Sequence, residues 1–311
     1  MVGTLALIIG LSTTVFAVVL SLFSTFSFVT LGVLVVAFNI FQWLISPYII
    51  DALYHTRELK EDENPNLHQV VDELSRKSGI KTPRLMLAQI PIPNAFAYGS
   101  PIAGNRVAVT NGLLKTLDQG EVEAVVGHEL GHLKHRDVQI MMFVSLLPAL
   151  FYFLGYSFML SSYGRQREGG NSALLGIGFM AFSWILNMFI LYLSRLREYY
   201  ADRHSAFMVD NGSQKLSTGL AKIVQATKNM GKTKKETQNL HGFKALFIAD
   251  PDRAQIDSAN TSAMSQTGEE KSVQEILSRK ITATDKLMEI LSTHPNMVKR
   301  LRALKELGSS A

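Results

Sequence analysis

The sequence predicts a polytopic membrane protein of the α+β class, mainly α, with four transmembrane helices and a soluble part that contains a few short strands. Of its 311 residues, 47% are apolar and only 18% are charged, an unusually apolar balance for a soluble protein. Four stretches contain no Asp, Glu, Lys, Arg or His, and each is close to the ~20 residues that a spanning helix needs. They are residues 5–23, 26–45, 138–160 and 173–193.

The apolar stretches divide the chain into membrane and soluble segments. Buried helices of a soluble protein are the alternative interpretation, but core helices rarely continue this long without a charge. The first stretch lacks the basic segment that precedes the apolar part of a secretory signal, so we expect it to be retained as a span. The chain then consists of a first transmembrane pair (1–50), a soluble segment (51–137), a second pair (138–194) and a second soluble segment (195–311).

Basic residues near the span ends predict which side of the membrane the soluble segments occupy. Four spans place both soluble segments on one side and the loop 161–172 on the other. The loop carries only Arg165 and Arg167 near the spans. The positive-inside rule therefore predicts a multi-pass protein of the cell membrane whose soluble part faces the cytoplasm. The basic residues on that side are Arg57, Lys60, Lys134, Arg136, Arg195, Arg197 and Arg203.

Charge and cysteine content exclude several kinds of partner and site. The net charge of +5 is modest, and no basic tract is interleaved with aromatic residues, so we expect membrane lipid but no nucleic acid as a partner. The chain has no cysteine, which excludes disulfides and thiolate metal ligands. The sequence does not determine the oligomeric state.

Capping residues mark two helices in the first soluble segment. Asn64 and Pro65 are typical of a helix start, and Gly79 of its end. Asp118 followed by Glu121 resembles a capping box, and we expect the helix that it opens to continue unbroken into the third span.

The rest of the soluble part is expected to combine short strands with further helices. Residues 84–88, 94–98 and 106–110 are predicted to be strands, followed by a turn at Asn111 and Gly112. After the fourth span, the helix should continue to about residue 209, and more helices should follow. The polar stretch 258–271 is expected to be mobile.

One short motif indicates a hydrolytic metal site. In His128-Glu129-Leu130-Gly131-His132 the two histidines are four residues apart, so a helix presents them on one face about 6 Å from each other, where they can share one zinc ion. Glu129 between them can take a proton from a water molecule without being a ligand. The alternative is a pair of surface histidines on an amphipathic helix.

A hydrolytic zinc site also needs a third protein ligand, which must be His, Asp or Glu in a chain without cysteine. His135 is nearest in sequence, but it lies roughly 10 Å along the helix axis from His128, so we interpret it as a polar residue near the membrane interface. Glu198 is the better candidate, with Asp202 on the same helical face able to orient a ligand histidine. His132 precedes the third span and Glu198 follows the fourth, which puts both at a similar depth. An ordinary solvated carboxylate pair is the alternative interpretation of Glu198 and Asp202.

These motifs resemble the HtpX-type membrane zinc metalloproteases, which are gluzincins related to the zinc-dependent CAAX prenyl protease. The resemblance rests on residues 126–137, 198–202 and 292–295, and it covers most of the chain. It implies a gluzincin-like protease domain with His128, His132 and Glu198 as zinc ligands and Glu129 as the catalytic glutamate. It further implies that Asn94, Ala95 and Phe96 bind the substrate backbone and that His294 helps to stabilise the oxyanion.

The predicted function is therefore a membrane-anchored zinc metalloendopeptidase with one Zn²⁺ per chain. It should hydrolyse protein or peptide substrates, and the resemblance implies misfolded membrane proteins and a role in membrane protein quality control. A transporter would normally show ionisable groups within its spans, and there are none. A non-catalytic, zinc-stabilised membrane scaffold protein is the remaining alternative, although a scaffold does not need Glu129.

Overall fold

The computed structural model describes residues 28–163, 169–231 and 269–310. The described residues form two compact units: a helical unit, which contains residues 28–45 and the described part of Gln139–Ser194, and a mixed unit, which contains Ser46–Val138 and the described residues from Arg195 onward. The first predicted span lies outside the described residues. Residues 258–268 of the polar stretch that is predicted to be mobile also lie outside them.

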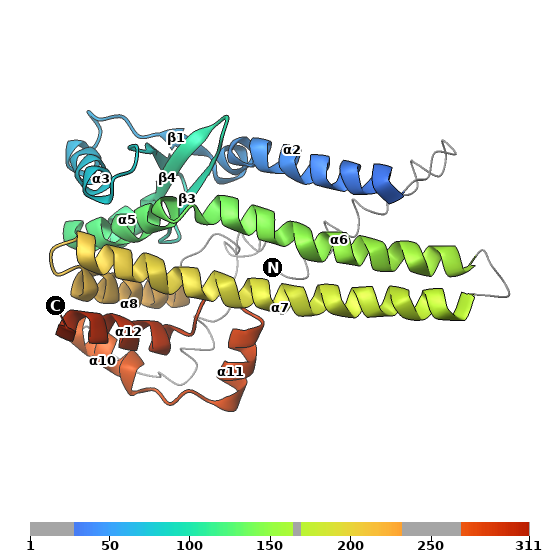
Figure 1. Ribbon diagram of the computed structural model, residues 1–311. Coiled ribbons are helices and arrows are strands. Elements are labelled where there is room, and N and C mark those ends of the chain that lie inside the picture. Colours follow the sequence, from blue (N-terminus) through green and yellow to red (C-terminus); the bar gives the residue numbers. More distant parts are fainter. Residues whose placement is uncertain (1–27, 164–168, 232–268, 311) are drawn as a thin grey trace. The chain divides into compact units, whose positions relative to one another are not determined.

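Three described helices are long and apolar enough to cross a membrane (Figure 1): α2 (Phe28–Tyr54), α6 (Asp137–Tyr163) and α7 (Gly169–Met208). They contain the third and fourth predicted stretches and residues 28–45 of the second. Helices α6 and α7 approach closely at two glycines, because a Cβ added to Gly155 would lie 2.6 Å from the carbonyl oxygen of Gly176. The candidate spans end at Met159 and begin again at Ser172, close to the predicted bounds of the loop 161–172, while α6 continues to Tyr163 and α7 begins at Gly169.

The mixed unit contains a four-stranded sheet with the order β1-β2-β4-β3. The strands are β1 (Thr56–Glu58), β2 (Arg84–Ala88), β3 (Ala95–Ser100) and β4 (Gly104–Thr110). Strand β2 pairs parallel with β4, and β3 pairs antiparallel with β4 at the edge of the sheet. The three predicted strands are confirmed, with shifts of up to two residues. Strand β1 was not predicted because its three residues, Thr-Arg-Glu, have no apolar alternation.

Local capping explains the helices around the sheet. In α3 (Pro65–Ser78), the Asn64 side chain accepts a hydrogen bond from the Leu67 amide at 3.1 Å, and Gly79 ends the helix with φ of 65°. The predicted turn after β4 is wrong, since α4 (Asn111–Thr116) begins there. Thr110 is the reason, because its hydroxyl caps the amide of Leu113 at 3.0 Å and so starts a helix.

Helix α5 (Gln119–Lys134) begins with the predicted capping box of Asp118 and Glu121. Its predicted continuation into the third span is wrong. The helix ends at Lys134 with His135 as its C-cap, Arg136 adopts a left-handed φ of 55°, and α6 starts at Asp137. This break turns the Asp137 side chain back toward α5, where it meets His132.

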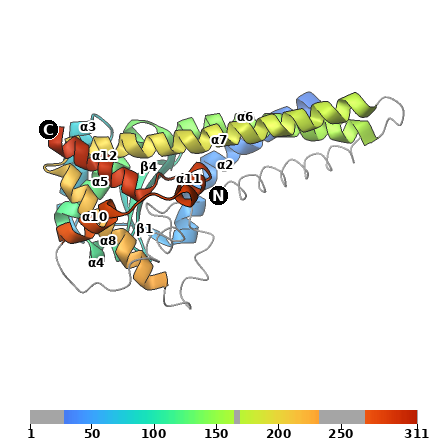
Figure 2. The ribbon, with the colours of Figure 1, turned by 90° about the horizontal axis from the view of Figure 1, so that it is seen from below.

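Helix α5 lies between the sheet and the helices of the second soluble segment. It contacts β3, β4, α3 and α8, and α8 in turn contacts α10 and α12 (Figure 2). The bounds of these helices are α8 (Gly212–Gly231), α10 (Glu269–Ser278), α11 (Ala283–Ile290) and α12 (Met297–Ser310). Fully buried leucines, including Leu130, Leu220 and Leu301, join these layers into one core.

Candidate metal centre and active site

Helices α5 and α7 bring three side chains with metal-ligating atoms together. The ligating atoms of His128, His132 and Glu198 all lie within 4.8 Å of one another. Close approach of the helices requires a small residue on α5, since a Cβ on Gly131 would lie 3.0 Å from the Cα of Ala201. Among the described residues, no other group of three His, Cys, Asp or Glu side chains converges in this way.

The distances within this group fit a tetrahedral zinc site. The Nε2 atoms of His128 and His132 are 3.2 Å apart, and two nitrogens bound to one zinc ion at 2.0–2.1 Å lie about 3.3 Å apart in a tetrahedron. Glu198 Oε1 is 3.5 Å from His132 Nε2, and Glu198 Oε2 is 3.7 Å from His128 Nε2. Glu198 Oε2 is also buried; it accepts no well-aligned hydrogen bond, although Arg300 Nη1 lies 3.2 Å and His294 Nδ1 lies 3.3 Å from it. A cation among these atoms would satisfy that oxygen and both imidazole nitrogens.

Each histidine of the group has a carboxylate on its second ring nitrogen. Asp202 Oδ1 lies 2.9 Å from His128 Nδ1, and Asp137 Oδ2 lies 2.6 Å from His132 Nδ1. Such pairs orient a histidine and increase its basicity as a ligand. Burial alone would lower the pKa of His132. The hydrogen bond to Asp137 and the neighbouring carboxylates outweigh this effect, so the pKa of His132 is raised. Burial and Arg300 lower the pKa of His128.

Asp137 was missed by the sequence analysis because a continuous helix would have pointed it away. Five residues after His132, an unbroken helix turns through roughly 140° relative to that histidine. The left-handed residue Arg136 interrupts the helix, and Asp137 Oδ2 lies 2.6 Å from His132 Nδ1. No pattern in the sequence predicts a left-handed arginine, so the break had no local signal.

Arg300 of α12 is the second functional candidate that the sequence analysis missed. Its guanidinium is buried and donates two hydrogen bonds to Asp202, from Nε at 2.6 Å and from Nη2 at 2.7 Å. Its Nη1 lies 3.2 Å from Glu198 Oε2. The sequence did contain a signal that Arg300 is buried. With helical periodicity, Arg300 falls on the same face as Met297, Leu301 and Leu304, all of which are buried.

Glu129 lies beside the metal group and against the sheet. Its side chain is 3% exposed, and its Oε2 accepts a hydrogen bond from the Ala97 amide at 2.8 Å. Burial raises the pKa of Glu129 to about 7, close to the value that suits a general base at neutral pH. A bound cation would favour the ionised form of this carboxylate.

The strand that faces Glu129 is β3, which contains most of the predicted substrate segment. Asn94 is buried, and both its backbone groups bond to Thr110: its amide to the hydroxyl at 2.9 Å and its carbonyl to the amide at 3.0 Å. Ala95 is also buried, whereas the Phe96 ring packs between Tyr54 and Tyr98. Since Ala97 directs its amide to Glu129, alternate backbone groups of β3 point away from β4.

Two further histidines, His294 and His135, differ in their relation to the metal group. His294 precedes α12, and its Nδ1 lies 3.3 Å from Glu198 Oε2, so it belongs to the same cluster. His135 lies outside the metal group, with its ring 5.9 Å from that of Tyr200 and 6.0 Å from that of His204.

Comparison with known proteins places these residues in a family context. Residues 61–308 match the model of Peptidase family M48. The chain is 40% identical over 278 residues to the protease HtpX homolog of Thermoplasma acidophilum, covering 88% of this chain and 83% of that protein. It is 38% identical over 286 residues to the protease HtpX homolog of Aeropyrum pernix, covering 90% and 86%. In fold it resembles the crystal structure of S. mikatae Ste24p, with a TM-score of 0.59 and 18% identity over 97% of this chain and 63% of that one.

Proposed function

Since the chain belongs to Peptidase family M48 and is a membrane metalloprotease that acts on proteins, we propose that it is a zinc-dependent endopeptidase with one Zn²⁺ per chain. The observation that carries this proposal is the convergence of His128, His132 and Glu198 beside Glu129. A two-histidine, one-glutamate set leaves a fourth position open, as hydrolytic zinc sites require.

The side chains around the metal divide the chemistry among them. When bound by His128, His132 and Glu198, zinc supplies Lewis acidity that polarises a water molecule and the scissile carbonyl. Glu129 removes a proton from the water and delivers it to the leaving amine. His294 is the candidate for stabilising the oxyanion, because it lies beside Glu198 and its side chain is more exposed than that of His132, at 20% against 12%.

The other members of the cluster hold the ligands in place. Asp202 and Asp137 fix the ring orientations of His128 and His132. Arg300 neutralises Asp202 and offsets part of the carboxylate charge near Glu198. Neither aspartate nor the arginine is assigned a step in the reaction.

An extended substrate would bind along β3 by main-chain pairing. Strand β3 is at the sheet edge, and the amide of Ala97 already points to the catalytic carboxylate. A peptide added to this edge at residues 94–96 would pass beside Glu129. Of the three predicted substrate-binding residues, Ala95 is best placed to offer backbone groups, since Asn94 uses its own within the sheet.

The biological setting is the finer part of the proposal. We infer four spans in the cell membrane and a protease domain on the cytoplasmic side, from the basic residues counted in the sequence. Membrane protein quality control and misfolded membrane proteins as substrates are inferred from the resemblance to HtpX-type proteases. A zinc-stabilised scaffold would need no buried carboxylate whose pKa is raised to about 7 at the position of Glu129.

The decisive experiment separates metal binding from catalysis. Glu129→Gln keeps the size of the side chain but removes its basicity, so zinc should remain near one per chain while cleavage of an unfolded model protein falls by ~10²- to 10⁴-fold. His132→Ala should lose both metal and activity. The matched control is Glu123→Gln, on the same helix but paired with Lys215, which should retain both. Undiminished cleavage by the zinc-loaded Glu129→Gln protein would mean that this mechanism is wrong and that a contaminating protease accounts for the activity.

A further inference from the structure

Helix α11 buries its acidic side chains and exposes its aliphatic ones, the reverse of a helix that packs on an apolar core. Its acidic residues, Asp285 and Glu289, are buried, whereas Leu287 is 62% exposed and Ile290 is 50% exposed. Leu291, the residue that caps the helix, is 55% exposed. The outward face of α11 is therefore a contiguous aliphatic patch, which we name the α11 patch (Leu287, Ile290 and Leu291). Contiguous exposed apolar patches are typical of interaction surfaces, whereas single exposed apolar residues are common on any protein.

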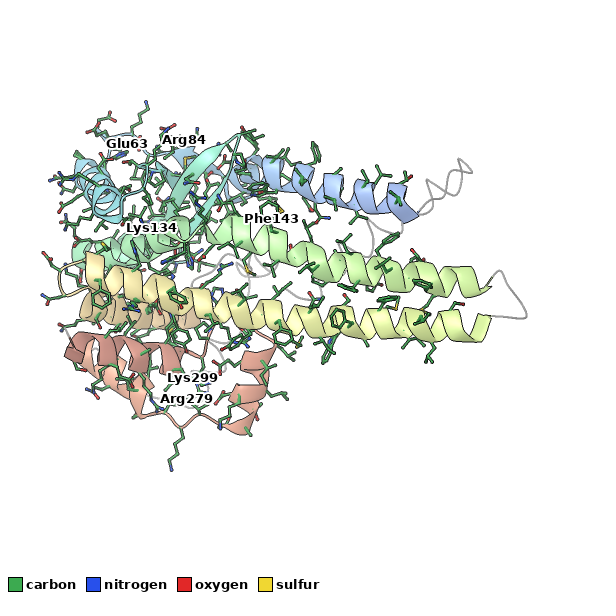
Figure 3. All side chains as sticks on the ribbon, viewed as in Figure 1. Glu63, Arg84, Lys134, Phe143, Arg279 and Lys299 are labelled. Carbon is green, nitrogen blue, oxygen red and sulfur yellow. The ribbon has the colours of Figure 1, made fainter. Side chains whose placement is uncertain are left out.

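The orientation of α11 is fixed by the partners of its acidic residues. Asp285 accepts a hydrogen bond from the Thr282 amide at 2.8 Å and lies 3.3 Å from the Arg279 guanidinium. Glu289 accepts hydrogen bonds from the Asn296 amide at 3.2 Å and from Lys299 at 2.5 Å. Figure 3 labels Arg279 and Lys299, the cations of these two pairs. Rotating α11 to hide its leucines would expose these pairs and leave the cations without their carboxylates.

Arg195 ties the end of α11 to a defined point of helix α7. Its Nη1 donates to the carbonyl oxygens of Glu289 at 2.7 Å, Ile290 at 3.1 Å and Ser292 at 2.8 Å. Along α7, Arg195 is the first charged residue after the charge-free residues 172–194, which form most of a candidate span. In a bilayer spanned by residues 172–194, a basic residue in that position would lie at the membrane–water interface. The carboxyl end of α11 is therefore held at the same level.

The charges around the α11 patch match a lipid surface. Between residues 279 and 295, the only acidic side chains are Asp285 and Glu289, and both are buried. Lys280 and Lys286 are exposed. The accessible surface is therefore aliphatic and basic, the combination by which interfacial helices bind anionic bilayers. We propose that α11 lies in the membrane interface with Leu287, Ile290 and Leu291 inserted among lipids.

Because the chain has no cysteine, single cysteines can report the surroundings of α11 without background. Ile290→Cys and Leu287→Cys would each be introduced into full-length, zinc-loaded Glu129→Gln protein and labelled with an environment-sensitive fluorophore. The proteins would be reconstituted in vesicles of phosphatidylcholine and phosphatidylglycerol. The control is Glu306→Cys on α12, which is exposed and is not next to the aliphatic patch. The inactive background keeps the result independent of whether the proposed catalytic mechanism is correct.

Two quenchers then distinguish the possible surroundings. Lipids brominated near the headgroup should lower fluorescence at 287 and 290 by about half or more, as for a helix buried 5–10 Å into the interface, and should leave 306 unchanged. Aqueous iodide should show the reverse pattern. Equal iodide quenching at all three positions would overturn the proposal, because the patch would then face water. Protection from both quenchers would also overturn it, since a protein surface, either another part of this chain or a second copy, would then cover α11.

Discussion

Replacing Asp137 by Asn should weaken zinc binding by roughly tenfold. The carboxylate of Asp137 is 3% exposed and lies 2.6 Å from His132 Nδ1, so it accepts a charge-assisted hydrogen bond from His132, a proposed zinc ligand. Asparagine can accept the same hydrogen bond with its amide oxygen but carries no charge. Hydrogen bonds to charged groups contribute about 1.5–3 kcal/mol and neutral ones about 0.5–1.5 kcal/mol, which leaves a loss of ~1–1.5 kcal/mol. A factor of ten in affinity corresponds to about 1.4 kcal/mol.

The measurement is a titration of apoprotein with zinc in competition with a chelator of known affinity, in detergent at constant pH. Asp137→Ala should lose more, toward the ~100-fold end of the range for residues behind a zinc ligand, because no acceptor replaces the carboxylate. The control is Asp72→Asn, an exposed aspartate of α3, which should bind zinc like the parent. If Asp137→Asn bound zinc as tightly as the control while keeping its fold, the hydrogen bond to His132 would not contribute to the metal site.

Three further predictions concern the third ligand, the buried arginine and the topology. Glu198→Gln should lower bound zinc sharply while His135→Ala keeps it, and metal analysis giving the opposite pattern would refute the ligand assignment. Arg300→Met should destabilise the protein by about 3–5 kcal/mol in denaturant unfolding, because removal of one member of a buried charge cluster leaves its carboxylates unpaired; a loss below 1 kcal/mol would contradict this. Ser162→Cys should react with an impermeant thiol reagent outside intact cells and Glu306→Cys should not, whereas reversed labelling would place the protease domain outside.

Much of the fold could be predicted because its signals are local. Asn64 and Asp118 start helices through hydrogen bonds to amides three residues away, and Gly79 ends one through its own backbone. The charge-free stretches likewise need only composition. The break between α5 and α6 could not be predicted, since it depends on a left-handed Arg136 that no residue preference indicates.

The candidate site divides in the same way. His128, Glu129 and His132 lie on one turn of helix, so spacing alone places them together. Glu198 was predicted as the third ligand because a hydrolytic zinc site needs one, and the structure places its carboxylate beside the two histidines. Arg300 is 98 residues from its partner Asp202, and a pairing at that distance is decided by how α12 packs on the core. Helix periodicity indicates that this arginine is buried, but it does not indicate which carboxylates the arginine contacts.

The small size of Gly131, between the two histidines of the motif, is required by the packing of the neighbouring helix. A motif scan treats this residue as free, yet a Cβ there would lie 3.0 Å from both the Ala201 Cα and the His204 Cβ of the neighbouring helix. A small residue at this position therefore indicates that a second helix packs against the motif closely enough to contribute a candidate ligand. In an uncharacterised sequence, the size of this variable residue could be used to judge whether the missing ligand comes from a packed helix or from an adjacent loop.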